Sequence, residues 1–94
     1  MKYCVYILAS KRNGTLYIGY TDNLVRRIYQ HKNNLVEGFT KKYKVHTLVY
    51  YECSDSVSAV MERERQLKNW RRQWKINLIN EHNQQWRDLY DELL

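Results

Sequence analysis

The sequence has no proline, only three glycines and only two cysteines among its 94 residues. No proline- or glycine-rich stretch and no low-complexity run reads as a linker, so residues 1–94 are expected to form one small domain. Cys4 and Cys53 lie in apolar segments and form no Cys-x-x-Cys or Cys/His cluster, which argues against a zinc site. We therefore expect two reduced thiols in the core of a cytosolic protein.

Long hydrophobic runs are also missing. The apolar run Tyr3–Ala9 is too short to span a membrane, and the charges of Lys11 and Arg12 follow it closely. The run also lacks the length and cleavage pattern of a signal peptide. The sequence thus predicts a soluble protein of the cytoplasm with no membrane partner.

Acidic side chains are scarce in the first half of the chain. Residues 1–50 contain nine Lys and Arg against two Asp and Glu, whereas residues 51–94 contain seven against eight, for a net charge of +6. A basic half favours a polyanion as partner, because neutralising its phosphates releases counterions. Nucleic acid is the polyanion that we expect.

One basic segment, residues 68–75, also carries aromatic side chains. Its cations are candidates for contacts with backbone phosphates: Lys68, Arg71, Arg72 and Lys75. An exposed tryptophan there could stack on a base, but the i, i+4 spacing of Trp70 and Trp74 is typical of a stripe that faces the core. We expect the tryptophans to be core residues.

Hydrophobic patterning predicts an α+β fold in the order β-β-α-β-α-α-α. Strands are expected over residues 3–9, 15–20 and 45–53, and helices over residues 24–32, 56–69, 71–81 and 84–93. Asn13-Gly14 predicts a hairpin, and a right-handed crossover then returns the third strand beside the first. The result is a three-stranded antiparallel sheet in the order 2-1-3, flanked by helices. Residues 33–44 lack periodicity and are expected to form a loop anchored by Phe39.

Glu64 stands out in the helix expected over residues 56–69. The apolar stripe of that helix consists of Val57, Val60, Met61 and Leu67. Glu64 falls on this stripe, whereas Glu62 and Arg65 fall off it and are expected to be solvated. A carboxylate on a buried face is costly unless it is paired or binds a metal. Both a salt bridge to a buried arginine and a metal ligand fit the pattern.

A second set of polar residues lies between Tyr6 and His31. Tyr6 and Tyr17 sit on the first two strands, and Arg27 and His31 follow one helical turn apart. Arg27 shares the edge of the inward face formed by Leu24, Ile28 and His31, whereas Arg26 points elsewhere. Arg27 could bind a phosphate in a bidentate way or pair with Glu64. Two phenols, a cation and an imidazole together indicate a phosphate-handling site.

These residues resemble the GIY-YIG endonuclease family, which includes the amino-terminal nuclease domain of UvrC and the catalytic domains of some homing endonucleases. The resemblance covers residues 3–90 and is greatest to the small stand-alone bacterial members. Its phrases are Cys4-Val5-Tyr6, Tyr17-Ile18-Gly19-Tyr20-Thr21, Phe39-Thr40-Lys41-Lys42-Tyr43, Leu48-Val49-Tyr50-Tyr51-Glu52, and Arg63-Glu64 through Leu67-Lys68 and Trp70. Cys4-Val5 replaces the name-giving Gly-Ile, within a buried strand. Tyr20 stands where UvrC-type domains carry a lysine, which removes one phosphate contact.

The resemblance also implies roles. Tyr17 matches the tyrosine that deprotonates the attacking water, directly or as a relay, and Arg27 the arginine that holds the scissile phosphate. Glu64 matches the glutamate that binds a single Mg²⁺ or Mn²⁺, while Tyr6 and His31 match supporting positions. A free tyrosine has a pKa of about 10, so this base needs activation by the metal, Arg27 or His31. The late asparagine of the family matches Asn77 or Asn83, and Gly19 the glycine beside the site.

The sequence therefore predicts a metal-dependent endonuclease that hydrolyses DNA phosphodiester bonds, with a place in DNA repair or recombination. The alternatives are a nucleic-acid-binding module with little or no cleavage and a small protein-interaction domain. Intact Tyr17, Arg27 and Glu64 favour the nuclease, because binding alone needs no carboxylate beside a phosphate. No separate DNA-recognition domain is present, which leaves room for a protein partner that supplies specificity. The oligomeric state is left open.

Overall fold

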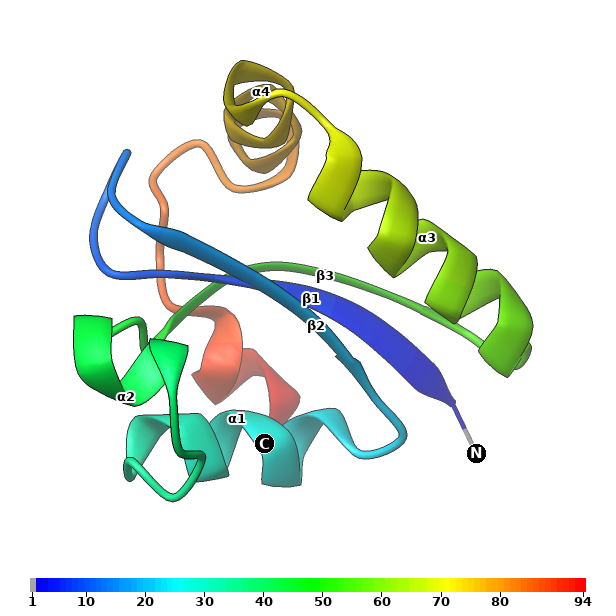
Figure 1. Ribbon diagram of the computed structural model, residues 1–94, viewed down its shortest axis with the longest axis horizontal. Coiled ribbons are helices and arrows are strands. Elements are labelled where there is room, and N and C mark those ends of the chain that lie inside the picture. Colours follow the sequence, from blue (N-terminus) through cyan, green and yellow to red (C-terminus); the bar gives the residue numbers. More distant parts are fainter. Residues whose placement is uncertain (1) are drawn as a thin grey trace.

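The computed structural model describes residues 2–94 and places a three-stranded sheet between two layers of helices (Figure 1). The elements are β1 (Tyr3–Ala9), β2 (Leu16–Thr21), α1 (Leu24–Lys32), α2 (Phe39–Tyr43), β3 (Thr47–Ser54), α3 (Val57–Asn69), α4 (Arg72–His82) and the 3₁₀ helix η1 (Leu89–Leu93). Helices α3 and α4 cover one face of the sheet, and α1, α2 and η1 cover the other. No helix among the described residues is long and apolar enough to cross a membrane.

The strand order is β2-β1-β3, with both neighbours of β1 antiparallel to it, which confirms the predicted α+β sheet. The central strand is apolar on both faces, and each residue of 4–9 is at most 5% exposed. Val5 and Ile7 pack with Val60 and Leu67 of α3, whereas Tyr6 and Leu8 pack with Ile28 of α1. Two hydrophobic cores thus share one strand, because neighbouring side chains of β1 point to opposite faces.

Three expectations about local structure need correction. Residues 39–43 form the short helix α2, although a loop is expected there. In place of the helix expected over residues 84–93, the structure has only the 3₁₀ helix η1. Phe39 is 44% exposed and does not anchor the segment in the core; within residues 33–44 only Thr40 is buried. The reason is that α2 is only one turn long and turns Thr40, its second residue, towards His31 of α1.

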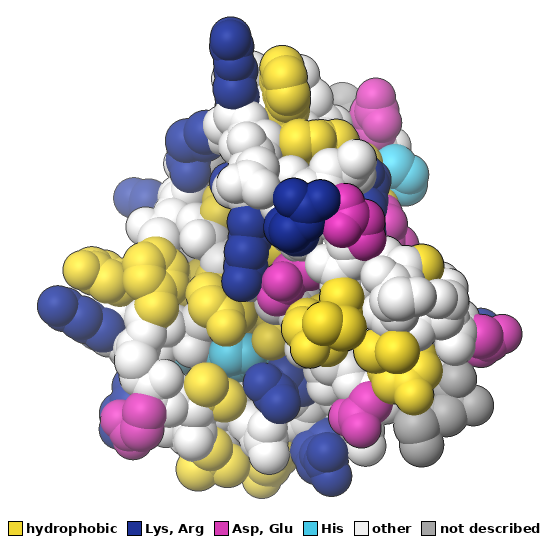
Figure 2. All heavy atoms as spheres, turned by 45° about the vertical axis from the view of Figure 1, so that its right-hand side comes forward, with side chains coloured by type: hydrophobic (Ala, Val, Ile, Leu, Met, Phe, Trp, Pro, Cys, Tyr) yellow, Lys and Arg dark blue, Asp and Glu magenta, His cyan; other side chains and the backbone are white. Residues whose placement is uncertain are grey.

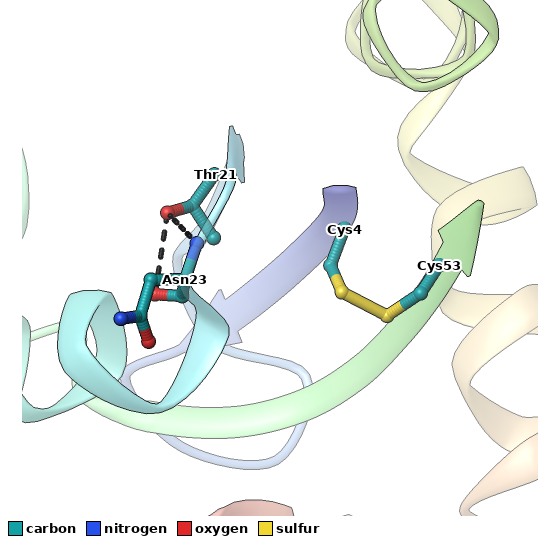
Figure 3. The surroundings of a disulfide bond; sticks show 4 residues. All are labelled: Cys4, Thr21, Asn23 and Cys53. Atoms are coloured by element: carbon teal, nitrogen blue, oxygen red, sulfur yellow. Dashed lines mark hydrogen bonds between the residues drawn. A yellow bond between two sulfur atoms is a disulfide. The ribbon is translucent and has the colours of Figure 1, made fainter. Parts of the chain in front are cut away.

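Cys4 and Cys53 form a disulfide, so the expectation of two reduced thiols is wrong (Figure 3). The two cysteines are direct partners in the β1–β3 register, with Cα atoms 4.0 Å apart. Cys4 is buried, whereas Cys53 is exposed. On its other side Cys4 is paired with Thr21, whose hydroxyl accepts from the backbone N–H of Asn23 at the start of α1. The disulfide therefore lies at the end of the sheet where α1 begins.

Candidate active site

Tyr6 lies at the centre of the candidate site. Its side chain is 1% exposed and points from β1 towards α1, where its hydroxyl is 3.0 Å from Nε2 of His31. Its ring centroid lies 6.3 Å from that of Tyr17 on β2. Gly19 is the direct partner of Tyr6 on β2, and a Cβ atom there would lie 2.6 Å from the Tyr6 hydroxyl. A glycine is thus required, because the tyrosine ring occupies the place of its side chain.

His31 links Tyr6 to α2. Its Nδ1 atom lies 2.9 Å from the hydroxyl of the buried residue Thr40, so each ring nitrogen has one partner. Burial, helped by the charges of Arg27 and His46, lowers the pKa of His31 to about 4. The imidazole is therefore neutral near pH 7 and carries a proton on only one of its two nitrogens. Tyr6, His31 and Thr40 form a continuous buried hydrogen-bonded chain.

Arg27 and Glu64 reach the same centre from α1 and α3. Burial raises the pKa of Tyr6, as do the neighbouring Tyr17 and Glu64, whereas the charge and hydrogen bonding of Arg27 lower it. Burial is the largest of these effects, so Tyr6 stays protonated at neutral pH. Arg27 and Glu64 therefore both act electrostatically on the same buried phenol.

The helix α1 has the orientation that its sequence predicts. Leu24, Ile28 and His31 are buried, Arg27 is half-buried, and Arg26 is exposed and lies 3.9 Å from Asp22. Asn23 caps the helix by accepting a hydrogen bond from the backbone N–H of Arg26. Among residues 2–94, no ion pair within 4.0 Å joins Arg27 to Glu64. The guanidinium is left available for an anion.

Glu64 is held on the inner face of α3 between two buried residues, Val60 and Leu67. Its side chain is 17% exposed and lies 3.2 Å from Nζ of Lys68, one turn further along the helix. The predicted stripe is too broad, because Val57 and Met61 are 40% and 46% exposed. The helix is rotated so that the line through residues 60, 64 and 67 faces the sheet, and this rotation turns Val57 and Met61 to the solvent. Glu62 and Arg65 are exposed and pair with each other, as expected.

The residues present fit one hard divalent cation better than a closed metal cage. Among residues 2–94 no group of three or more His, Cys, Asp or Glu side chains could hold a metal ion. Mg²⁺ commonly keeps several waters and is bound by one or two carboxylates together with substrate phosphates. The half-buried Glu64 carboxylate could supply that one carboxylate, with a substrate phosphate and waters completing the coordination.

The geometry can be compared with known proteins. Residues 2–77 match the model of the GIY-YIG catalytic domain. The chain belongs to the GIY-YIG family. Membership makes it a relative of nucleases, whose substrates are nucleic acids. The match includes every strand and the helices α1, α2 and α3, and therefore Tyr6, Tyr17, Arg27, His31 and Glu64.

Similar proteins carry the name UPF0213. A UPF0213 protein of Staphylococcus saprophyticus is 38% identical over 80 residues, which cover 85% of this chain and 96% of that protein. One from Staphylococcus haemolyticus is 40% identical over the same shares of both chains. The solution NMR structure of a UPF0213 protein from Bacillus halodurans matches with a TM-score of 0.59 and 27% identity, covering 94% of this chain and 93% of the other.

Two lysines of the basic segment border the pocket that contains Tyr17. Lys68 of α3 and Lys75 of α4 line an open pocket together with Tyr17 and Phe39, over an apolar floor formed by Leu16 and Ile18. Burial, with the charge of Arg72, lowers the pKa of Lys75. On the face in Figure 2, hydrophobic and basic side chains gather around a recess in which a histidine is visible.

The two arginines of that segment have partners of their own. Arg72 donates through Nη2 to the backbone oxygens of Asn13 (2.6 Å) and Gly14 (2.7 Å) in the turn between β1 and β2. The guanidinium of Arg71 lies 5.6 Å from the ring centroid of Trp74. Arg71 therefore remains on the surface, whereas Arg72 joins α4 to the hairpin.

The expectation that both tryptophans are core residues is wrong for Trp74, which is 50% exposed. Trp70 is half-buried against the core, and its ring meets that of Trp74 edge-on at 6.1 Å. Helix α3 ends at Asn69 and α4 begins at Arg72, so residues 70 and 74 do not lie on one helix. Their i, i+4 spacing therefore does not place them on a common helical face. Trp86 is the tryptophan that is buried, at 6% exposed.

The structure also separates the two late asparagines. Asn83 is 6% exposed; its amide nitrogen donates to the oxygens of Val49 and Arg87, and its amide oxygen accepts from the Arg87 N–H. These hydrogen bonds use both the nitrogen and the oxygen of the amide, and they hold the chain that follows α4 in place. Asn77 is exposed on α4 and hydrogen-bonds to Gln73. Only Asn77 has a side chain that an approaching nucleic acid can reach.

Sequence reasoning missed Thr40. This residue is 2% exposed and is the second partner of His31, yet it lies in a polar stretch without periodicity. The one available signal was its place within Phe39-Thr40-Lys41-Lys42-Tyr43, a phrase that the GIY-YIG resemblance already contains.

Proposed function

We propose that this GIY-YIG domain, formed by residues 1–94, is a divalent-metal-dependent endonuclease that hydrolyses DNA phosphodiester bonds. One observation carries the proposal: groups from three different elements gather around the buried Tyr6. These groups are the phenol of Tyr17 on β2, the guanidinium of Arg27 on α1 and the carboxylate of Glu64 on α3. A binding module would need the cation but not the carboxylate.

Arg27 supplies the positive charge for the phosphate under attack. An arginine without an acidic partner can donate two parallel hydrogen bonds to phosphoryl oxygens, and these bonds strengthen as negative charge develops. Half-burial on the edge of α1 reduces the number of orientations that its side chain can adopt. The side chain is therefore largely positioned before substrate arrives.

Tyr17 is the proposed base or relay for the attacking water. Both nitrogens of His31 are engaged, by Tyr6 and Thr40, so His31 influences Tyr17 only through Tyr6 and through ring packing at 5.5 Å. Direct activation of Tyr17 is left to Arg27 and to the cation held by Glu64. Tyr6 and His31 act as positioning residues, which fix the phosphate side of the cleft.

Glu64 is the residue that would hold Mg²⁺ or Mn²⁺. When bound, such an ion supplies positive charge for the leaving 3′ oxygen. The half-buried position of Glu64 strengthens its attraction for a cation, and Lys68 neutralises it in the free protein. Lys68, Arg71 and Lys75 are proposed contacts for flanking phosphates, and Arg72 presents its remaining N–H groups beside them.

The biological setting that we propose is DNA repair or recombination in the cytoplasm, with a protein partner that supplies specificity. The support is the membership of a nuclease family, which implies a nucleic-acid substrate, and the excess of Lys and Arg in residues 1–50.

The test is cleavage of single-stranded, duplex, flapped and branched DNAs with Mg²⁺ or Mn²⁺. We expect Tyr17→Phe, Arg27→Ala and Glu64→Gln to abolish cleavage without loss of folding. The neighbouring exposed residues provide matched controls: Arg26→Ala and Glu62→Gln should cleave as the wild type does. Absence of cleavage by the wild type on every DNA, or full cleavage by the three site variants, would refute the proposal.

A further inference from the structure

The aromatic side chains of the site continue beyond Tyr17 onto the surface of α2. The ring of Phe39 is stacked on that of Tyr17, with centroids 6.1 Å apart and planes inclined by 28°. The Tyr43 ring follows one turn later, with its centroid 4.8 Å from that of Phe39. Phe39 and Tyr43, which we call the α2 shelf, are 44% and 48% exposed.

The α2 shelf exposes its two aromatic rings to the solvent instead of burying them in the hydrophobic core. Two adjacent, half-exposed aromatic rings beside a catalytic tyrosine leave apolar area uncovered. Phe39 is also a wall of the pocket that contains Tyr17, so the shelf and the cleft form one continuous surface. Whatever covers the shelf therefore lies next to Tyr17.

Charges around the shelf are positive. Lys68 and Lys75 form the opposite wall of the same pocket, and Nζ of Lys42 lies 5.4 Å from the centroid of the Tyr43 ring. The nearby acids are already paired: Glu64 with Lys68, and Glu37 with Lys41. A flat apolar surface flanked by lysines is complementary to a nucleotide. The flat base can stack on the aromatic rings, and the lysines attract the phosphate.

The nucleotide has to be unpaired. Bases inside a duplex are stacked above and below, and only an unstacked or displaced base offers a free face to an aromatic side chain. We infer that the α2 shelf stacks an unpaired nucleobase of the DNA strand, next to the phosphate bound at Tyr17 and Arg27. This inference rests on the proposed function and adds the substrate class: DNA with an unpaired nucleotide at the cleavage position.

A binding assay is needed here, because a loss of cleavage in a Phe39 variant could arise either from lost stacking on the base or from a disturbed contact between Phe39 and Tyr17. The experiment uses the full chain with Glu64→Gln and measures the anisotropy of three labelled DNAs: a 12-nucleotide single strand, the same strand with abasic sugars throughout, and a blunt duplex. Phe39→Ala should weaken binding of the base-bearing strand by about 5- to 150-fold and change the other two by less than about twofold. Phe39→Trp should restore the affinity.

Tyr29→Ala is the matched control, because Tyr29 is similarly exposed, at 52%, but lies on α1 outside the pocket. It should leave all three affinities unchanged. Equal losses on the base-bearing and abasic strands, or a failure of Phe39→Trp to restore binding, would overturn the inference while leaving the nuclease proposal intact. A wild type that cleaves nothing, together with base-dependent binding at Phe39, would refute the nuclease and support the stacking surface.

Discussion

The neutral state of His31 can be tested through the stability of the protein in mild acid. The side chain is 1% exposed and its pKa is about 4 in the folded protein, whereas an unfolded chain takes up this proton near pH 6.5. Between those values the unfolded state binds more protons, so the free energy of unfolding rises with pH and falls as the solution is acidified. Because most carboxylates titrate below pH 5, the window from pH 6.5 to 5 isolates the histidine.

The expected loss follows from the width of that window. A pKa unit corresponds to 1.36 kcal/mol, and the slope reaches this full value only below pH 6.5, so acidification from pH 6.5 to 5 should lower the free energy of unfolding by about 1.5 kcal/mol. With an m-value of about 1 to 2 kcal/mol/M, the urea midpoint should fall by about 0.8 to 1.5 M. Equilibrium urea unfolding, followed by circular dichroism at several pH values, measures this loss.

Two variants assign the effect to its source. His31→Gln should be less stable at all pH values but should lose most of the slope between pH 6.5 and 5. His82→Gln, on the other side of the sheet, should keep the slope. In proton NMR, the ring signals of His31 should not titrate above about pH 5. A flat profile in the wild type, or an unchanged slope in His31→Gln, would show that the imidazole is not held neutral by burial.

Three further predictions concern the frame of the site. Gly19→Ala should cost about 1 to 3 kcal/mol, since its Cβ meets the buried Tyr6 ring; an unchanged urea midpoint would contradict this. Cys53→Ser should lower the free energy of unfolding by up to about 4 kcal/mol, because the disulfide closes a loop with a separation of 49 residues. Dithiothreitol should reproduce that loss in the wild type and change nothing in the variant, and equal sensitivity of both proteins would count against the disulfide. Thr40→Val should cost about 1 to 3 kcal/mol by leaving Nδ1 of His31 without a partner, whereas Thr40→Ser should restore most of the loss.

The sheet and the inward face of α1 could be predicted from the sequence because local patterns decide them. β1 is apolar at every position, and only a central strand covered on both faces accommodates such a run. Leu24, Ile28 and His31 share a helical face, so burial of the two aliphatic residues carries the histidine inward with them. The same logic placed Glu64 between Val60 and Leu67.

Features that depend on strand register or on the packing of one element against another could not be predicted. The pairing of Cys4 with Cys53, which are 49 residues apart in the sequence, follows from the register of β1 and β3, which no local pattern fixes. The break between α3 and α4 is predicted correctly, but the exposure of Trp74 is not, because the i, i+4 spacing of Trp70 and Trp74 runs across that break. Thr40 is buried only because α2 packs over the end of α1 and meets His31.

The contact of Arg72 with the hairpin has a consequence for the thermodynamics of binding. The arginine donates only to backbone oxygens of the turn, so it holds the shape of the turn independently of the side chains there. It thereby ties α4, which carries Lys75, to the hairpin that carries Tyr17, and fixes the distance across the pocket between them. A nucleic acid then meets walls that are already ordered. Less conformational entropy is lost on the protein side, and the free and bound forms of this part of the chain should superpose closely.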